Sequence, residues 1–307
     1  MTKKPILTGL IAAPFTPMHP NGEVNLAAID AYANHLIRHG GVTGVFICGT
    51  TGESASLTTE ERKAIAEKWV TAAGGKLKII VHVGTTSLPQ AVDLAAHAQA
   101  IGADVISAMA PFFFKPASVE DLVSFFVPVA AAAPKLPFFY YNMPSMTGVS
   151  LPVERFLTEG KKRIPTLAGV KFTHNNLMEM QQCIHAKDGE FEVLHGFDEI
   201  LITGLAAGAK AAVGSTYNYI PSVYRRIMDA MQKGDLETAR KWQWESVKIL
   251  DIVIRHGGGV RGGKMLMTLA GVECGPCRLP IAPYSEAEFR EIEAQLRQTV
   301  FFEAVRE

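Results

Sequence analysis

The sequence predicts an α/β protein, a (β/α)8 TIM barrel with a C-terminal helical extension. Short apolar runs rich in β-branched and aromatic residues alternate with helix-length amphipathic segments along most of the chain. Near-continuous apolar strands separated by helices are typical of a parallel sheet that is covered on its outer face. Eight such units are the number that closes a barrel. An open doubly wound sheet has less support, because no G-x-G-x-x-G motif follows the first strand.

The predicted strands are short, and most of them end in glycine, proline or asparagine. They begin near Thr8, Thr43, Lys78, Asp104, Pro137, Leu167, Phe191 and Lys210. The segments between them carry helix signals. Thr58-x-x-Glu61 forms a capping box, and Ile65, Trp69 and Ala73 then recur on one helix face. Residues 88–101 and 119–133 follow the same pattern.

After the eighth strand the alternation stops and helices follow one another. The helical segments are 223–233, 236–256, 263–270 and 286–303, and the first is expected to serve as the eighth barrel helix. We therefore expect a catalytic barrel over residues 1–225 and a helical extension over residues 226–307. The glycine-rich run 257–263 lacks the G-K-[ST] ending of a phosphate-binding loop and follows a helix, so we interpret it as a break between helices.

The composition argues against several classes of partner. The chain has 30 lysines and arginines against 30 aspartates and glutamates, with no basic stripe, which disfavours nucleic acid or a membrane surface. No apolar stretch is long enough to cross a bilayer, and we expect a cytoplasmic protein. Four cysteines do not make a disulfide scaffold, and we interpret the single Cys274-Gly-Pro-Cys277 motif as structural. The histidines show no metal-binding spacing, and His82 is expected to be a core residue.

Lys171 is the sharpest candidate for chemistry. It lies within the apolar run 167–172, and strand alternation places it on the face opposite Val170 and Phe172. If that bulky pair faces the helices, Lys171 projects into the barrel. Burial disfavours the charged form of an amine and so makes a nucleophile available for attack on a carbonyl. The alternative is a lysine that reaches solvent or pairs with a carboxylate.

Two other strand ends carry polar groups that suit a site at the mouth of a barrel. Tyr140 and Tyr141 point to opposite faces, and parity does not decide which one faces inward; an inward tyrosine could relay a proton or simply pack. Thr50 and Thr51, between Gly49 and Gly52, offer hydroxyls and unhindered backbone N–H groups that suit a carboxylate. The alternative is a glycine-flanked turn with local threonine hydrogen bonds.

Together these motifs resemble the superfamily of N-acetylneuraminate lyases and dihydrodipicolinate synthases, which are pyruvate-dependent class I aldolases. The resemblance runs from about residue 6 to about residue 297 and is carried by G-T-T-G-E, Y-N-M-P with a following T-G, G-V-K and A-V-G-S. It implies that Lys171 forms an imine with the 2-oxo carbon. It also implies that Tyr141 is the proton-relay phenol and that Thr50 and Thr51 hold the pyruvate carboxylate.

Within the superfamily the sequence resembles the N-acetylneuraminate lyase branch. Thr173 follows Lys171-Phe172 as it does in lyases, and the segment 196–199 matches the lyase pattern G-[YF]-D-E. The resemblance implies that five residues contact the substrate: Thr173, Gly196, Asp198, Glu199 and Ser215. Two adjacent acids at a helix start would also favour the helix dipole. The synthases typically carry an arginine two residues after the proline of Y-N-x-P, where this chain has Met146.

The expected activity is reversible cleavage of N-acetylneuraminate to pyruvate and N-acetyl-D-mannosamine, without a metal or organic cofactor. The resemblance also implies a homotetramer. Many relatives offer a tyrosine across a subunit interface in a P-F-Y-Y segment. Here residues 112–114 are all phenylalanine, which weakens a relay between two phenols. The alternatives are another pyruvate-dependent aldolase, including dihydrodipicolinate synthase, and a catalytically silent barrel that binds a sugar acid.

Overall fold

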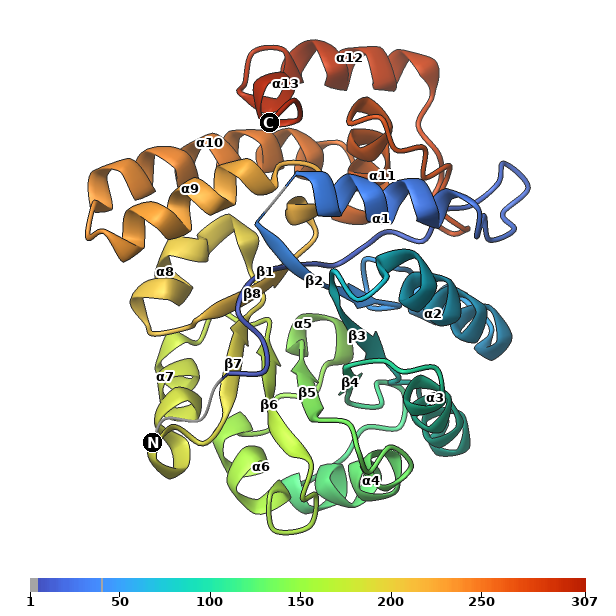
Figure 1. Ribbon diagram of the computed structural model, residues 1–307, viewed down its shortest axis with the longest axis vertical. Helices are drawn as coiled ribbons and strands as arrows, with labels where there is room; N and C mark the ends of the chain where they lie inside the picture. Colours follow the sequence, from blue (N-terminus) through green and yellow to red (C-terminus); the bar gives the residue numbers. More distant parts are fainter. Residues whose placement is uncertain (1–4, 40) are drawn as a thin grey trace.

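The protein is a closed barrel of eight parallel strands in chain order, as the sequence predicts (Figure 1). The computed structural model describes residues 5–39 and 41–307. The strands are β1 Gly9–Ala12, β2 Val42–Ile47, β3 Lys78–His82, β4 Val105–Met109, β5 Phe138–Asn142, β6 Leu167–Phe172, β7 Glu192–His195 and β8 Ala211–Gly214. β1 pairs with both β2 and β8, which closes the barrel.

A ring of helices covers the outside of the barrel (Figure 1). These are α1 Ala28–Arg38, α2 Thr59–Ala73, α3 Leu88–Ala100, α4 Val119–Ala131, α6 Val153–Gly160, α7 Leu177–His185, α8 Leu201–Ala206 and α9 Pro221–Gln232, with the short α5 Pro144–Thr147 before α6. The capping box at α2 forms as predicted: Glu61 N–H donates to the Thr58 hydroxyl at 3.1 Å, and Thr58 N–H donates to the Glu61 carboxylate at 2.8 Å.

Apolar side chains form two layers, one on each face of the barrel strands. The layer between strands and helices includes Val170 and Phe172, whereas the smaller layer inside the barrel includes Ile11, Phe139 and Leu194. Backbone N–H groups of Ile6 and Leu7 donate to the Glu192 carboxylate at 2.5 and 3.0 Å, and Leu7 belongs to the inner layer. These contacts close the end of the barrel at which the strands begin.

The C-terminal extension packs on one side of the barrel, with α10 Leu236–Arg255 lying along α9 (Figure 1). The expected boundary after residue 225 falls inside α9, which follows β8 and contacts β1 as the eighth barrel helix does. The division into barrel and extension stays a prediction. The remaining helices after α10 are α11 Gly259–Leu269, α12 Glu286–Leu296 and α13 Phe301–Ala304.

Two details of the extension differ from the sequence prediction. The helix expected at 263–270 begins earlier, at Gly259, directly after Gly257 and Gly258, whose positive φ angles separate α11 from α10. Gly263 therefore lies inside α11, where it packs against Phe15: a Cβ on Gly263 would lie 2.1 Å from that ring. The helix expected over 286–303 is broken between α12 and α13. The Thr299 hydroxyl donates to the Leu296 carbonyl at 2.7 Å and accepts from Phe301 N–H at 3.2 Å, so this side chain competes with the helix for backbone partners.

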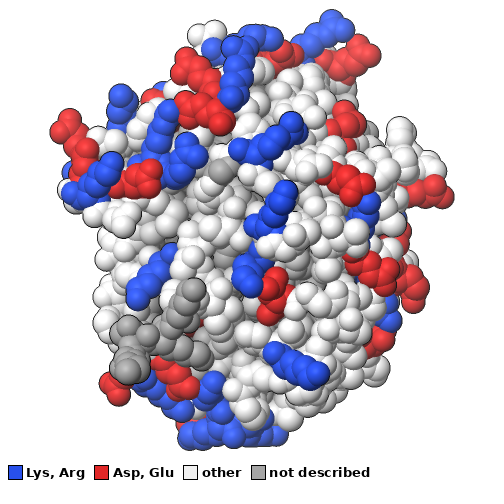
Figure 2. Space-filling view, viewed as in Figure 1, with Lys and Arg blue, Asp and Glu red and all other residues white. Residues whose placement is uncertain are grey.

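Charged side chains of both signs are interspersed on the surface of the molecule that Figure 2 shows. Within residues 5–39 and 41–307, no helix combines the length and the hydropathy that a membrane crossing requires.

Candidate active site

Lys171 points into the barrel near the end at which the strands finish. It is the fifth residue of β6, and only 5% of it is exposed. Its amine lies 4.1 Å from the centre of the Phe46 ring and 4.0 Å from the centre of the Tyr141 ring. Among the residues that the structure describes, no carboxylate forms an ion pair with it. The alternatives of a solvent-facing or carboxylate-paired lysine do not describe this geometry.

Tyr141 is the inward-facing member of the tyrosine pair. It lies directly beside Lys171 in the β5–β6 register and packs in the inner layer, whereas Tyr140 packs between the barrel and its helices against Phe156. The Tyr141 hydroxyl donates to the Met143 sulfur at 3.0 Å and lies 3.3 Å from the Thr50 hydroxyl. The phenol and the glycine-flanked turn therefore meet above the amine.

The glycine-flanked turn, residues 49–53, follows β2. Glu53 N–H donates to the Thr50 carbonyl at 3.0 Å, and the Thr16 hydroxyl donates to the Gly52 carbonyl at 2.7 Å. Thr50 and Thr51 are partly exposed at the barrel mouth. The turn thus presents two hydroxyls on a backbone that the β1–α1 segment holds.

Thr173 lies one residue past β6, with a buried hydroxyl that lacks a hydrogen-bond partner within the described chain. Gly196 makes room for it, because a Cβ at position 196 would lie 2.0 Å from the Thr173 hydroxyl. A buried hydroxyl without a partner costs stability, and a partner from outside the chain is one explanation for such a group. This pair of residues is therefore ready to accept a polar ligand group.

Asp198 and Glu199 follow β7 in the short 3-10 helix η3 Asp198–Ile200, and neither caps a helix with its side chain. The Asp198 carboxylate accepts from the backbone N–H and the hydroxyl of Thr216, at 2.9 and 2.5 Å. Burial, and then repulsion from Asp198, raises the pKa of Glu199 to about 7. An acidic side chain with a strongly shifted pKa beside a barrel mouth is typical of a site that binds or transforms a ligand.

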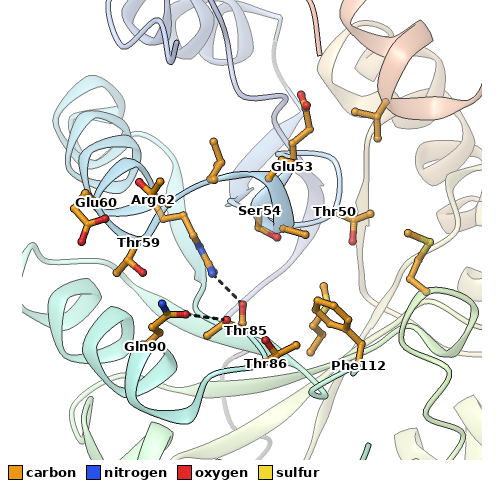
Figure 3. Close-up of a pocket in the computed structure, with 18 of the residues that line it drawn as sticks. Thr50, Glu53, Ser54, Thr59, Glu60, Arg62, Thr85, Thr86, Gln90 and Phe112 are labelled. Atoms are coloured by element: carbon orange, nitrogen blue, oxygen red, sulfur yellow. Dashed lines mark hydrogen bonds between the residues drawn. The ribbon is translucent and has the colours of Figure 1, made fainter. Parts of the chain in front are cut away.

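A cavity of about 660 Å³ opens beside the barrel mouth, at the ends of β2, β3 and β4 (Figure 3). Thr50, Met109, Phe112 and Met146 line one part of it, whereas Lys171 and Glu199 do not line it. Thr50 therefore lines the cavity and also lies beside Tyr141, the neighbour of Lys171. Met146 is 62% exposed, and Ser215 is partly exposed after β8.

Other polar residues of the interior have structural partners. Both ring nitrogens of His82 have partners: Nδ1 lies 2.9 Å from the Cys48 carbonyl oxygen, and Nε2 accepts from Met109 N–H at 3.3 Å, so His82 is a satisfied core histidine as expected. Cys274 and Cys277 are free, and burial raises their pKa values to about 12 and about 11. Both stay thiols at neutral pH. The described residues contain no cluster of three or more histidine, cysteine or acidic side chains suited to a metal.

The comparisons with known proteins agree with this geometry. The Dihydrodipicolinate synthetase family matches residues 6–299. The chain belongs to this family. Among its relatives, N-acetylneuraminate lyase from Gallus gallus is 44% identical over 304 residues, which cover 98% of this chain and 99% of the relative.

Two solved structures of the family differ in their similarity to this chain. The N-acetylneuraminate lyase of Aliivibrio salmonicida superposes with a TM-score of 0.93 at 44% identity, covering 96% of this chain and 97% of that one. A dihydrodipicolinate synthase of Bacillus anthracis superposes with a TM-score of 0.86 at 26% identity, covering 94% and 97%. Of these two, the lyase is the nearer in both sequence and structure.

Sequence reasoning missed several residues of this site. Phe46 flanks the Lys171 amine, and Thr216 holds Asp198, but a strand phenylalanine and a threonine after a strand carry no distinctive signal. Glu53 lies inside the G-T-T-G-E motif and could have been singled out there. Its buried partner Lys264 is 211 positions away and shows no pattern that links the two.

Proposed function

We propose that the chain is an aldolase that cleaves N-acetylneuraminate reversibly into pyruvate and N-acetyl-D-mannosamine through a Schiff base at Lys171. The observation that carries the proposal is the Lys171 amine, buried between two aromatic rings at the barrel mouth without a carboxylate partner. Full-length similarity to lyases supports the choice of substrate.

The proposed reaction begins when Lys171 Nζ attacks C2 of the open-chain 2-oxo acid and water leaves, which forms a protonated imine. The imine withdraws electrons as the C3–C4 bond breaks and the C4 hydroxyl loses its proton. The phenol oxygen of Tyr141 accepts that proton while its own hydroxyl proton passes to the substrate carboxylate, so Tyr141 acts as a relay and stays neutral. Protonation of the enamine at C3 and hydrolysis of the imine then release pyruvate, so the cycle requires no metal or organic cofactor.

The two ends of the substrate engage different parts of the mouth. Thr50 and Thr51 bind the carboxylate with hydroxyl and backbone donors, while Thr173, Gly196, Asp198, Glu199 and Ser215 serve the polyhydroxy tail. The unpaired Thr173 hydroxyl and the raised pKa of Glu199 support the second assignment. Because residues 112–114 are phenylalanines, the relay depends on Tyr141 rather than on a second phenol at that segment.

The test uses the fact that, within residues 5–39 and 41–307, two lysines are buried, Lys171 and Lys264. Incubation with pyruvate and borohydride, followed by peptide mass mapping, should find the reduced adduct on Lys171 and none on Lys264, which pairs with Glu53. Lys171→Ala should abolish lyase activity while the fold survives in circular dichroism. An adduct on another lysine, or active protein without any adduct, would reject the mechanism.

We also propose that the chain assembles into a homotetramer, as the resemblance implies. Phe112, Phe113 and Phe114 are 38%, 74% and 87% exposed, and three adjacent exposed aromatic side chains are typical of an interaction surface. The mass in solution, measured by light scattering, checks this assembly.

A further inference from the structure

The glycine-flanked turn is held in a strained backbone conformation. Cys48 precedes the turn and Glu53 is its last residue, and both adopt positive φ angles, of 53° and 56°, which residues other than glycine rarely adopt. Strain of this kind persists only where surrounding contacts enforce it. The contacts that enforce it at Glu53 come from outside the barrel.

The Glu53 carboxylate forms a fully buried ion pair with Lys264 of α11. Oε1 of Glu53 lies 2.7 Å from Nζ of Lys264, and each side chain is 2% exposed. Oε2 accepts from Arg278 N–H at 2.9 Å, and Lys264 also donates to the Pro276 carbonyl at 2.7 Å. Figure 3 shows Glu53 pointing away from Thr85, Thr86 and Gln90, the cavity residues beyond the turn. The C-terminal extension therefore holds the turn from behind.

The opposite side of the same turn faces the reaction centre. Thr50 is joined to Glu53 by the hydrogen bond from Glu53 N–H to the Thr50 carbonyl, and its hydroxyl lies 3.3 Å from the Tyr141 hydroxyl. A shift of Glu53 would thus move Thr50 relative to both Tyr141 and the incoming carboxylate. Displacements of about 1 Å at reacting groups are large enough to change binding and turnover.

We propose that Glu53 and Lys264 are positioning residues that set the height of the Thr50–Thr51 turn over the 2-oxo acid carboxylate. This inference rests on the proposed function. Neither residue touches the substrate. Their effect therefore reaches the carboxylate through the turn and appears in the affinity for pyruvate rather than in the chemistry of Lys171.

The test compares Lys264→Met with two further variants. Lys264→Met leaves the Glu53 carboxylate buried without its partner, which destabilises the fold. The double variant Glu53→Gln with Lys264→Met removes both charges and should recover the melting temperature. Arg261→Met is the matched control, because Arg261 lies one turn earlier on α11 and pairs with Glu288 at 3.3 Å, away from the turn. The measurement is borohydride trapping at Lys171 as a function of pyruvate concentration.

We expect the pyruvate concentration for half-maximal trapping to rise on the order of tenfold in both variants that carry Lys264→Met. A change of this size corresponds to the loss of one hydrogen bond between the turn and the charged carboxylate of pyruvate. The rate of trapping at saturating pyruvate should stay near that of the unmodified chain in these variants. Arg261→Met should keep both the rate and the half-saturating pyruvate concentration of the unmodified chain. A double variant that regains both melting temperature and pyruvate affinity would show a purely structural role and overturn the inference.

A further single variant, Glu53→Gln, covers failure to fold. If neither Lys264 variant folds, Glu53→Gln alone decides, because it keeps the side-chain shape and an acceptor for Arg278 N–H; unchanged half-saturation there overturns the inference. Failure of the proposed function looks different, since the unmodified chain would then form no adduct at Lys171.

Discussion

Replacing Glu199 by glutamine should stabilise the folded chain at pH 8 and weaken turnover of N-acetylneuraminate at the same time. Burial and the neighbouring Asp198 raise the pKa of Glu199 from its ordinary value of 4.5 to about 7. The folded state therefore holds this proton more tightly than the unfolded state does. The carboxyl is protonated in both states below pH 4.5, so it contributes nothing there.

As the pH rises from 4.5 to 7, the unfolded chain releases this proton first, and the free energy of unfolding falls. The full shift corresponds to about 3 kcal/mol, an upper limit because Glu199 is partly exposed and solvent screens its charge. Glutamine removes the penalty, and its amide can still donate to Asp198. We therefore expect a gain of about 1–3 kcal/mol at pH 8 that disappears near pH 4.5.

The assay is urea unfolding of both proteins at pH 8 and near pH 4.5, with Glu237→Gln as control, since Glu237 is an exposed acid in the first turn of α10. If Glu199 contacts sugar hydroxyls, kcat/KM for N-acetylneuraminate should fall about 5- to 150-fold, or about 1–3 kcal/mol, while pyruvate trapping at Lys171 stays nearly unchanged. A gain in the free energy of unfolding that does not depend on pH, or a loss of that free energy at pH 8, would refute the burial argument. Unchanged kcat/KM would remove Glu199 from the sugar site.

Two further predictions concern the class of aldolase. Activity should survive exhaustive chelation, because the imine does the electrophilic work that a metal performs in class II aldolases; a loss with EDTA that zinc restores would contradict the Schiff-base proposal. The purified protein should make no dihydrodipicolinate from pyruvate and aspartate semialdehyde, because Met146 cannot bind a second carboxylate. Turnover there at a rate comparable to lyase activity would show that Met146 was misinterpreted.

Periodicity was enough to predict the barrel, and it made the direction of Lys171 depend on that of its neighbours. Side chains in a strand alternate strictly, so Lys171 faces inward once the structure shows that Val170 and Phe172 pack outward against the helices. The same rule left Tyr140 and Tyr141 unresolved, because both are large and either could fill the core. Only the β5–β6 register, which places Tyr141 beside Lys171, decides between them.

Contacts between distant segments were beyond the reach of local patterns. The ion pair between Glu53 and Lys264 depends on how α11 packs against the barrel, which no local spacing encodes. The break between α12 and α13 depends on which hydrogen bonds the Thr299 hydroxyl makes. Tertiary packing chose the partner of Glu53. Thr299 instead bonds locally, to Leu296 and Phe301, and a threonine by itself does not indicate whether a helix continues past it.

The closed end of the barrel has a kinetic consequence for the proposed reaction. Beneath Lys171 the interior is filled by side chains such as Ile11 and Phe139, and Leu7 closes the far end, so no product can leave in that direction. The three-carbon fragment remains covalently attached to Lys171 after cleavage, while the sugar fragment lies nearer the mouth. The sugar must therefore depart before water can reach and hydrolyse the imine. Product-inhibition patterns should follow an ordered release, with pyruvate as the last product to dissociate.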